Sequence, residues 1–316
     1  MDVSVIICTH NRSRVLRGAL EALAAQQADG LDWEIVVVDN ASTDDTRRVV
    51  EAFRARSATP VRYLLEPVLG HSRSLNRAIA ASTGAIVAFT DDDARPEQEW
   101  LRQVHGAFSR YGAEWVFGKV LPEWEGVRPA WFSERFMGYF ALLDFGPQPF
   151  VVSDPRQSFY GVNCAARRDI LERLGGYRED YGPKGKFWGV GADTDLFERS
   201  LAAGYRIAYV PEAVVRHVIP ASRSSKRHQR EKVWHGTEGY YLFLREAVTN
   251  VPWLCGLPRY FHRKAIDDLA TYVRSLLRRD RSGAFYTELQ LIRFVGLSYQ
   301  AMRYRGAAGQ PESVLR

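Results

Sequence analysis

Cysteine is scarce in this chain of 316 residues, and long hydrophobic runs are absent. The three cysteines, Cys8, Cys164 and Cys255, lie far apart and form no CxxC pair, which argues against a disulfide framework and a thiolate zinc site. No run of about 18 apolar residues occurs, and no basic segment with a long apolar stretch precedes the first predicted strand. We therefore expect a cytoplasmic protein with no cleaved signal and no membrane-spanning helix.

Two common phosphate-binding motifs are absent as well. Residues 9–12, which follow the first predicted strand, contain no GxGxxG pattern. Gly185 and Lys186 are followed by Phe187, so the chain has no GxxxxGK[ST] motif. These absences argue against a Rossmann-type dinucleotide site and against a P-loop.

Excess positive charge is missing from the first two thirds of the chain, although the formal net charge is +6. Of the 43 Lys and Arg, 18 lie in residues 216–316, together with only 8 of the 37 Asp and Glu. A basic C-terminal third can serve anionic lipid, nucleic acid or an acidic substrate, or it can form an ordinary solvated helical surface.

Short apolar runs alternate with helical periodicity through the first 217 residues. We predict strands at 3–8, 33–38, 61–65, 85–90, 113–119, 159–165, 206–210 and 213–217. Helices are predicted at 15–23, 42–56, 71–81, 98–111 and 168–174, and from about 193 to 203. This alternation predicts an α/β fold with right-handed crossovers and a mainly parallel sheet, which binds its ligands in the loops after the strands.

The rest of the chain departs from this pattern in two places. Residues 122–155 are aromatic and rich in proline, and the stretch is too long for a structureless loop, so we expect short helical turns and a functional surface there. From residue 221 onward, three amphipathic helices are predicted at 226–249, 257–279 and 285–304. We therefore predict one domain over 1–220 and a basic helical region over 221–316.

Three adjacent carboxylates, Asp91, Asp92 and Asp93, end the buried strand at 85–90. Because like charges repel, these residues suit a divalent metal ion that holds a diphosphate. The alternative is an acidic turn that caps the following helix. Asp39 ends an earlier strand, where it can accept a hydrogen bond from a base edge or a ribose hydroxyl, or serve as a turn acid.

Two further residues are candidates for chemistry. Asp193 falls in the first turn of a predicted helix, where an acidic residue also interacts favourably with the helix dipole without any catalytic role. His217 ends a predicted strand, and it is either a core residue or a metal ligand.

Three segments together closely resemble the family 2 inverting glycosyltransferases, which have the GT-A fold. They are VIICTHNR at 5–12, IVVVDNASTD at 35–44 and FTDDD at 89–93, which is followed by Trp100 and Leu101. The resemblance covers about residues 2–217. It implies a UDP- or GDP-sugar donor, a Mn²⁺ or Mg²⁺ ion and an acceptor hydroxyl on a saccharide, a lipid-linked or another molecule, in the synthesis of bacterial polysaccharide, glycolipid or a related glycoconjugate.

The resemblance also implies roles for individual residues. The substrate-binding positions are Thr9, Arg12 and Asp39 around the donor base and ribose, Asn11 in the same segment as Thr9, Arg73 near the nucleotide, Asp91 and Asp92 in the DxD-type motif, and Trp188 beside the acceptor. Asp93 matches the metal ligand, and His217 matches a position that completes the metal site in some relatives. Asp193 falls where the family has its general base within a Glu-Asp pair, which here reads Ala192-Asp193. Asp195 is the next candidate for that role.

Other readings of the chain remain open at this point. A nucleotidyltransferase-type nucleotide-sugar enzyme also has carboxylates at the edge of a sheet, but it usually carries a glycine-rich basic loop after the first strand. A non-enzymatic module could use the basic tail to bind a membrane or nucleic acid. For a glycosyltransferase we expect no nucleic-acid partner. The C-terminal helices are expected to make a peripheral contact with the inner face of the membrane, or to contact a partner or the catalytic domain. A homo-oligomer is a further option.

Overall fold

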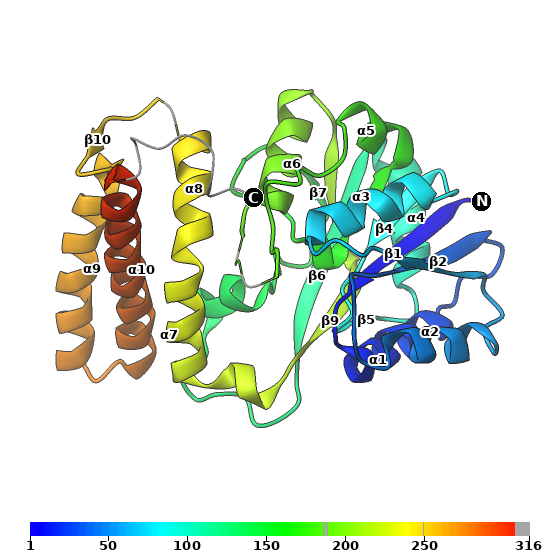
Figure 1. Cartoon of the computed structure of the whole chain (residues 1–316), viewed down its shortest axis with the longest axis horizontal. Coiled ribbons are helices and arrows are strands. Elements are labelled where there is room, and N and C mark those ends of the chain that lie inside the picture. Colours follow the sequence, from blue (N-terminus) through cyan, green and yellow to red (C-terminus); the bar gives the residue numbers. More distant parts are fainter. Residues whose placement is uncertain (186, 188, 249, 307–316) are drawn as a thin grey trace. The chain divides into compact units, whose positions relative to one another are not determined.

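The computed structural model describes residues 1–185, 187, 189–248 and 250–306, which form two compact units (Figure 1). The first unit contains residues 1–125, 137–185 and 191–219. The second contains residues 126–136 and the described residues of 186–190 and 220–306. Two short internal segments, within 126–136 and 186–190, therefore belong to the same unit as the C-terminal helices. The predicted division at residue 220 does not assign these segments to the C-terminal region.

A nine-stranded sheet forms the centre of the first unit. Its order is β3-β2-β1-β4-β8-β6-β9-β5, and β7 also pairs with β9. The strands are β1 (Val3–Thr9), β2 (Trp33–Asp39), β3 (Val61–Leu65), β4 (Ile86–Phe89), β5 (Ala94–Pro96), β6 (Trp115–Trp124), β7 (Phe150–Val151), β8 (Cys164–Arg167) and β9 (Ile207–Ile219). β1 to β4 are mutually parallel and β6 is parallel to β9, whereas β8, β5 and β7 are antiparallel to their neighbours. The predicted α/β fold with a mainly parallel sheet is confirmed.

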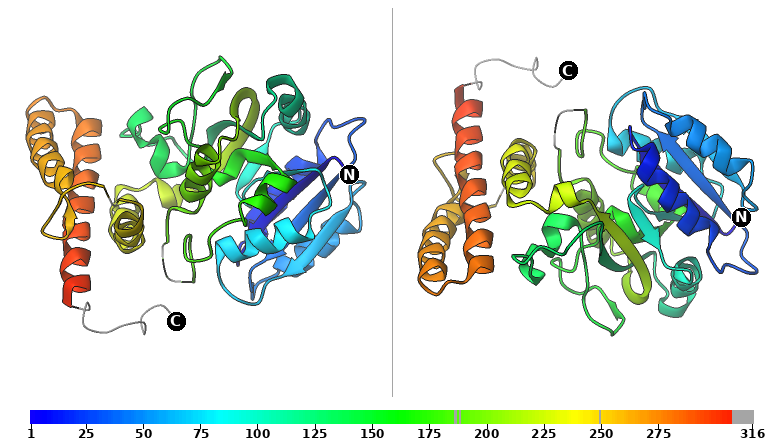
Figure 2. Two further views of the ribbon diagram at one scale, coloured as in Figure 1. Left: turned by 90° about the horizontal axis from the view of Figure 1, so that it is seen from above. Right: turned by 90° about the horizontal axis from the view of Figure 1, so that it is seen from below.

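The helices of the first unit cover both faces of this sheet. They are α1 (Ser13–Ala24), α2 (Thr46–Arg54), α3 (His71–Ala81), α4 (Trp100–Tyr111), α5 (Arg168–Arg173) and α6 (Ala192–Ala202). Figures 1 and 2 show α1 and α2 on one face and α3 on the other. Because β2 is covered on both faces, all seven of its residues are buried, as expected for a parallel strand.

Three of the predicted strands are wrong in detail. Residues 159–165 form a short 3₁₀ turn, Gly161–Asn163, followed by β8. The two strands predicted at 206–210 and 213–217 are one strand, β9, which is parallel to β6 with a break in register after Gly118. A Cβ atom at Gly118 would lie 1.9 Å from the Ala213 carbonyl oxygen, so a residue without a side chain allows this close approach.

A further difference is β5, a strand that the sequence did not predict. The chain leaves β4 at Phe89, turns through the three aspartates and re-enters the sheet as β5, antiparallel to β9. Ala94 then lies opposite His217, and the His217 region is joined to the turn by a hydrogen bond from the Val218 N–H to the Asp93 carbonyl, 2.8 Å.

Among the described residues, the second unit contains four C-terminal helices, because the helix predicted at 226–249 is divided into two. They are α7 (Lys226–His235), α8 (Thr237–Ala247), α9 (Arg259–Leu277) and α10 (Arg281–Gly306), and a hairpin of β10 (Trp253–Leu254) and β11 (Leu257–Pro258) precedes α9. Tyr241, Leu244, Leu257, Phe261, Leu297 and Ala301 form its buried apolar cluster. Figures 1 and 2 show α9 lying alongside α10.

The aromatic stretch at 122–155 contains the 3₁₀ helix η1 (Glu134–Phe140) and β7, so the expected short helical turns are present. Among the described residues, none of the helices combines the length and the apolar character that crossing a membrane requires.

Candidate active site

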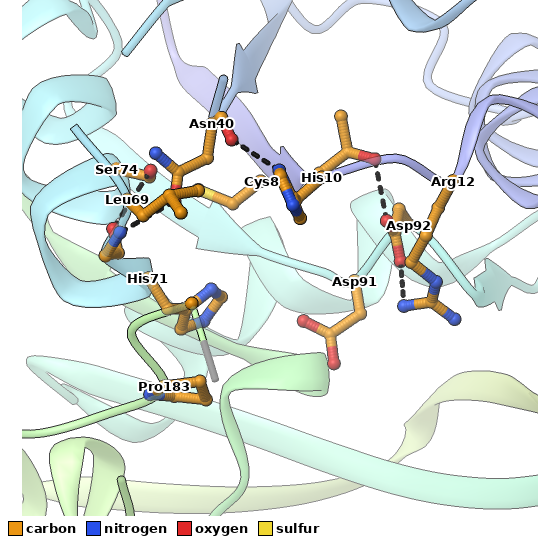
Figure 3. A pocket seen from close by; sticks show the side chains of 13 residues that line it. Cys8, His10, Arg12, Asn40, Leu69, His71, Ser74, Asp91, Asp92 and Pro183 are labelled. Carbon is orange, nitrogen blue, oxygen red and sulfur yellow. Dashed lines mark hydrogen bonds and ion pairs between the residues drawn. The ribbon is translucent and has the colours of Figure 1, made fainter. Parts of the chain in front are cut away.

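A pocket of about 360 Å³ opens where β1, β2 and β4 end, within the size range of small-molecule sites. Most of its lining comes from the loops after these strands and from the start of α3 (Figure 3). The lining residues are Cys8, Thr9, His10, Arg12, Asn40, Leu69, Gly70, His71, Ser74, Asp91, Asp92, Pro183 and Gly185. The carboxyl edge of the sheet therefore carries the pocket, as expected for an open α/β sheet.

The loops after β1 and β2 are tied to each other beside this pocket. Asn11 has a φ of 52°, a left-handed conformation that asparagine tolerates better than most residues. Its side-chain oxygen accepts hydrogen bonds from the N–H groups of Thr43, at 2.7 Å, and Asp44, at 3.3 Å. Asp39 accepts from the Ser42 N–H at 2.8 Å and from the Tyr63 hydroxyl at 2.7 Å. Asn11 and Asp39 therefore hold the loops in place and are not among the pocket-lining residues.

Asn40 and His10 form one wall of the pocket. The Asn40 side chain donates to the carbonyl groups of Glu66 and Val68 and accepts from the Gly70 N–H, at 3.2, 2.7 and 2.8 Å. His10 Nδ1 lies 2.6 Å from the Asn40 carbonyl oxygen, so this nitrogen carries the proton. These bonds fix the loop at 66–70, which leads into α3.

Arg12 connects two of the three aspartates. Its guanidinium donates to Asp92 Oδ1 at 2.5 Å and to Asp93 Oδ2. Asp92 also accepts from the Thr9 hydroxyl, at 2.7 Å, so both of its oxygens have partners. Figure 3 shows Asp91 turned away from the Arg12–Asp92 pair. Thr9, Arg12, Asp91, Asp92 and Asp93, which the sequence predicts as site residues, are thus brought together.

His217 meets Asp93 because β5 and β9 pair. Its Nδ1–H donates a hydrogen bond to the Phe140 carbonyl oxygen at 2.8 Å, which leaves Nε2 to face Asp93 Oδ1 at 3.1 Å. Burial works against ionisation of Asp93, but His217 and Arg12 hold the pKa of Asp93 well below its usual range. The Phe140 carbonyl therefore sets the orientation of the imidazole, as in many metal sites.

Asp91, Asp93 and His217 each offer one ligand atom, and these atoms all lie within 4.8 Å of one another. Burial and the charge of Asp93 raise the pKa of Asp91. A divalent cation at this point would offset the negative charge of both carboxylates, and its donor set would be two carboxylate oxygens and one imidazole nitrogen. The residues present therefore fit a divalent metal ion, with Asp91 as a third ligand beside the two that the sequence predicts.

Asp193 lies in the first turn of α6, and its Oδ2 accepts a hydrogen bond from the Gly161 N–H at 2.9 Å. Burial raises its pKa, while the Gly161 N–H and His71 oppose the rise. The charges of Asp193 and His71 both affect the pKa of Asp91. The two acidic centres are therefore close enough to influence each other electrostatically.

The remaining predicted site residues have other surroundings. Asp195 pairs with Arg199 at 2.7 Å, and Arg199 also donates to the carbonyl groups of residues 174 and 176. Arg73 is exposed and pairs with Glu179 at 3.1 Å, and it does not line the pocket. Trp188 lies outside the described residues.

His71 is a site residue that the sequence analysis missed. It opens α3, it lines the pocket with Asp91, and its charge lowers the pKa values of Asp91 and Asp193 (Figure 3). A histidine in a polar turn at the start of a helix gives little indication of its role. The Phe140 carbonyl was missed for another reason, because a backbone contact leaves no pattern in the sequence.

A model of the family described as "Glycosyl transferase family 2" matches residues 4–175. The chain is 28% identical over 243 residues to "Succinoglycan biosynthesis protein ExoM" of Rhizobium meliloti (strain 1021), which covers 75% of this chain and 74% of that protein. It is 27% identical over 231 residues to "Glucosyl-dolichyl phosphate glucuronosyltransferase" of Haloferax volcanii, covering 69% and 70%.

Solved structures share the fold. The mannosyltransferase PcManGT from Pyrobaculum calidifontis, in complex with GDP-Man and Mn²⁺, has a TM-score of 0.58 and 21% identity, with 99% of this chain and 76% of that chain covered. S. aureus TarS 1–349 in complex with UDP-GlcNAc has a TM-score of 0.51 and 17% identity, with 97% and 92% covered. The expected GT-A fold is thereby confirmed.

Proposed function

Because the chain belongs to glycosyl transferase family 2, we propose that its pocket binds a nucleotide-diphosphate sugar through a divalent metal ion and that Asp193 activates the acceptor. The protein is a glycosyltransferase, an enzyme class whose inverting reaction is consistent with this family. The observation that carries the proposal is the convergence of Asp91, Asp93 and His217 beside a pocket at the carboxyl edge of the sheet.

The metal site is proposed on Asp91, Asp93 and His217, with Mn²⁺ or Mg²⁺ as the ion. A bound cation of this kind stabilises the negative charge that develops on a diphosphate leaving group. The protein prepares the ligands beforehand: Arg12 holds Asp93 through Oδ2, and the Phe140 carbonyl orients the His217 ring. Asp93 Oδ1 and His217 Nε2 are thereby held 3.1 Å apart, close enough for one cation to contact both atoms.

The donor nucleotide is proposed to occupy the pocket lined by Thr9, His10, Arg12 and Asn40. Arg12 is 29% exposed, and part of its guanidinium can therefore reach a phosphate oxygen while it remains paired with Asp92. His71, on the opposite side of Asp91 from Arg12 in Figure 3, is placed to contact the same ligand. We propose Asp92 as the residue that positions Arg12, because it accepts a hydrogen bond from the guanidinium, and Thr9 as the residue that holds Asp92 through its hydroxyl.

Asp193 is proposed as the general base. Because burial raises its pKa, Asp193 is a stronger base than a fully solvated aspartate carboxylate. Among the described residues Asp193 forms no ion pair, whereas the carboxylate of Asp195 is paired with Arg199. The acceptor oxygen would lose its proton to Asp193 as it attacks the anomeric carbon from the face opposite the diphosphate. One displacement of this kind inverts the configuration at that carbon.

The finer partners are also proposals. GDP-Man and UDP-GlcNAc are bound by the two structural relatives, so UDP- and GDP-sugars are the donors to test first. The acceptor is proposed to be a hydroxyl of a saccharide or a lipid-linked molecule. The enzyme is proposed to be cytoplasmic, with C-terminal helices that contact a membrane peripherally.

Calorimetry with UDP and GDP, each with Mn²⁺ or Mg²⁺, tests the donor site. Asp93→Asn should abolish metal-dependent nucleotide binding, while Asp45→Asn, at an exposed aspartate, should bind as the wild type does. Metal-dependent binding that survives in Asp93→Asn would remove Asp93 from the site.

The base is tested separately. Asp193→Asn should retain nucleotide binding and lose sugar transfer, and Asp195→Asn should retain transfer if it remains folded. Transfer by Asp193→Asn at the wild-type rate would contradict the assignment of Asp193.

A further inference from the structure

Helix α9 has little buried surface for its length. Among its 19 residues, only Phe261 and Ser275 are buried. Phe261 belongs to the apolar cluster that packs between α9, α10 and α8. α9 therefore contacts its own unit along one side, and most of its circumference faces outward.

Part of the outward surface is apolar. Ile266, Leu269, Val273, Leu276 and Leu277 are between 49% and 81% exposed. Successive residues of an α-helix are about 100° apart, which places these five side chains within an arc of about 100°. We call this arc the α9 apolar face. Single exposed leucines are ordinary, but an exposed group of five on one face of a helix indicates a binding surface.

Basic residues follow one edge of the α9 apolar face. Arg259, Arg263, Arg274 and Arg278 are exposed and occupy the adjoining arc of the helix, with Asp267 as the acidic residue among them. Arg263 and Arg274 form no ion pair with any described residue. A helix with an apolar face beside a row of arginines is typical of segments that lie in the interface of a membrane.

The hairpin before α9 extends the apolar face at its N-terminal end. His262 lies within the same arc, and its Nε2 donates to the Leu254 carbonyl oxygen at 2.8 Å. Leu254 and the neighbouring Trp253 are themselves exposed, and so is Tyr260 at the start of the helix. Tryptophan and tyrosine are enriched where an apolar layer meets water.

We propose that the α9 apolar face, with its arginine edge and the tip of the hairpin, binds the surface of a membrane that contains anionic lipid. Charge favours this occupant over a second copy of the chain. A symmetric dimer with antiparallel α9 helices would bring identical arginine rows together, whereas an anionic surface attracts the whole row. The proposal does not depend on the transfer reaction, because none of these residues belongs to the pocket or the metal site.

Flotation of the full chain with vesicles tests this proposal in the absence of metal and nucleotide sugar. The vesicles contain phosphatidylcholine alone, or roughly three parts phosphatidylcholine to one part phosphatidylglycerol. The protein should float with the anionic vesicles at low salt, and the bound fraction should fall at high salt. Arg263→Gln and Arg274→Gln should each weaken anionic-vesicle binding by about fivefold.

The apolar contribution is tested with Ile266→Glu and Leu277→Glu, which should each lower the partition coefficient by about tenfold or more. Val127→Glu is the matched control, because it adds the same charge at a valine that is 94% exposed and outside α9. Because Ile266 and Leu277 are both exposed, the variants should have the same thermal unfolding midpoint as the wild type, which would show that they remain folded.

Three results would overturn the proposal. The first is flotation of Ile266→Glu and Leu277→Glu at the wild-type level, and the second is no flotation of the wild type. The third is a wild-type dimer in light scattering that Leu277→Glu converts to a monomer, which would assign the face to a second copy. Loss of flotation by Ile266→Glu and Leu277→Glu, with full transfer by both variants to a water-soluble acceptor, would support the proposal and leave the proposed transfer reaction and metal site untouched.

Discussion

Replacing Arg12 by glutamine should destabilise the first unit in the absence of metal. Arg12 pairs with Asp92 and Asp93, whose side chains are only 4% and 3% exposed. Glutamine retains a hydrogen-bonding group but carries no charge, so two buried carboxylates would lose a shared cation. Removing one partner of a buried ion pair costs about 3–5 kcal/mol.

Two features of the site set the size of this effect. Arg12 is itself 29% exposed, and proton uptake by Asp92, whose pKa burial raises to about 7, relieves part of the repulsion. We therefore take the lower end of that range, about 3 kcal/mol. For a domain of this size, each kcal/mol changes the melting temperature by about 2–4 °C, so a decrease of about 6–12 °C is expected.

Thermal unfolding in EDTA measures this change, and a second scan with Mn²⁺ tests its origin. Mn²⁺ should restore part of the lost stability by binding Asp91 and Asp93 in the native state. Arg12→Lys should be intermediate, because an ammonium group cannot bridge both carboxylates as a guanidinium does. Arg48→Gln, which breaks an exposed pair with Asp45, should melt as the wild type does. A wild-type melting temperature for Arg12→Gln in EDTA would refute the reasoning.

Three further predictions concern the base and the fold. Gly161→Ala should lower kcat with little change in the donor KM, since its Cβ atom would lie 2.9 Å from Asp193 Oδ1. The control Gly106→Ala places its Cβ atom in open space and should be fully active. A kcat for Gly161→Ala equal to that of the wild type would contradict this prediction. The rate below neutral pH should rise with pH through a pKa above the usual aspartate value of about 3.9, because burial raises the pKa of Asp193, and a profile that is flat down to pH 4 would count against it. Burial works against ionisation of Glu34, but hydrogen bonds from Thr83 and Ser4 lower its pKa overall. The contribution of Glu34 to stability is therefore present above the unfolded pKa of about 4.3 and disappears as pH falls through the lower folded value. Urea unfolding should show Glu34→Gln less stable by about 1–3 kcal/mol at pH 7 and less sensitive to acid, and an acid sensitivity equal to that of the wild type would argue against this role.

The parallel half of the sheet could be predicted because its signals are local. β2 is buried along its whole length and reads as one apolar run, and the predicted range 71–81 agrees with α3. The loop residues after β1 and β4 could be grouped for the same reason, because parallel neighbours end at one edge. Thr9, Arg12 and the three aspartates follow from that geometry.

The second part of the site depends on pairings that leave no local pattern. β5 has only three residues, Ala94 to Pro96, and two of them are arginine and proline, so neither alternation nor propensity marks it as a strand. Yet β5 places Asp93 beside His217. The sequence predicts two strands, at 206–210 and 213–217, where the structure has β9 alone. At the irregularity between them the Asn163 side chain donates to the Lys119 and Ala213 carbonyl groups, at 2.7 and 2.8 Å.

A crystal structure with Mn²⁺ and UDP or GDP tests the central claim most directly. We predict an anomalous manganese peak in contact with Asp91, Asp93 and His217, with the diphosphate on the ion and the nucleotide in the pocket beside Arg12 and Asn40. A nucleotide bound elsewhere, or manganese away from these three side chains, would contradict the account.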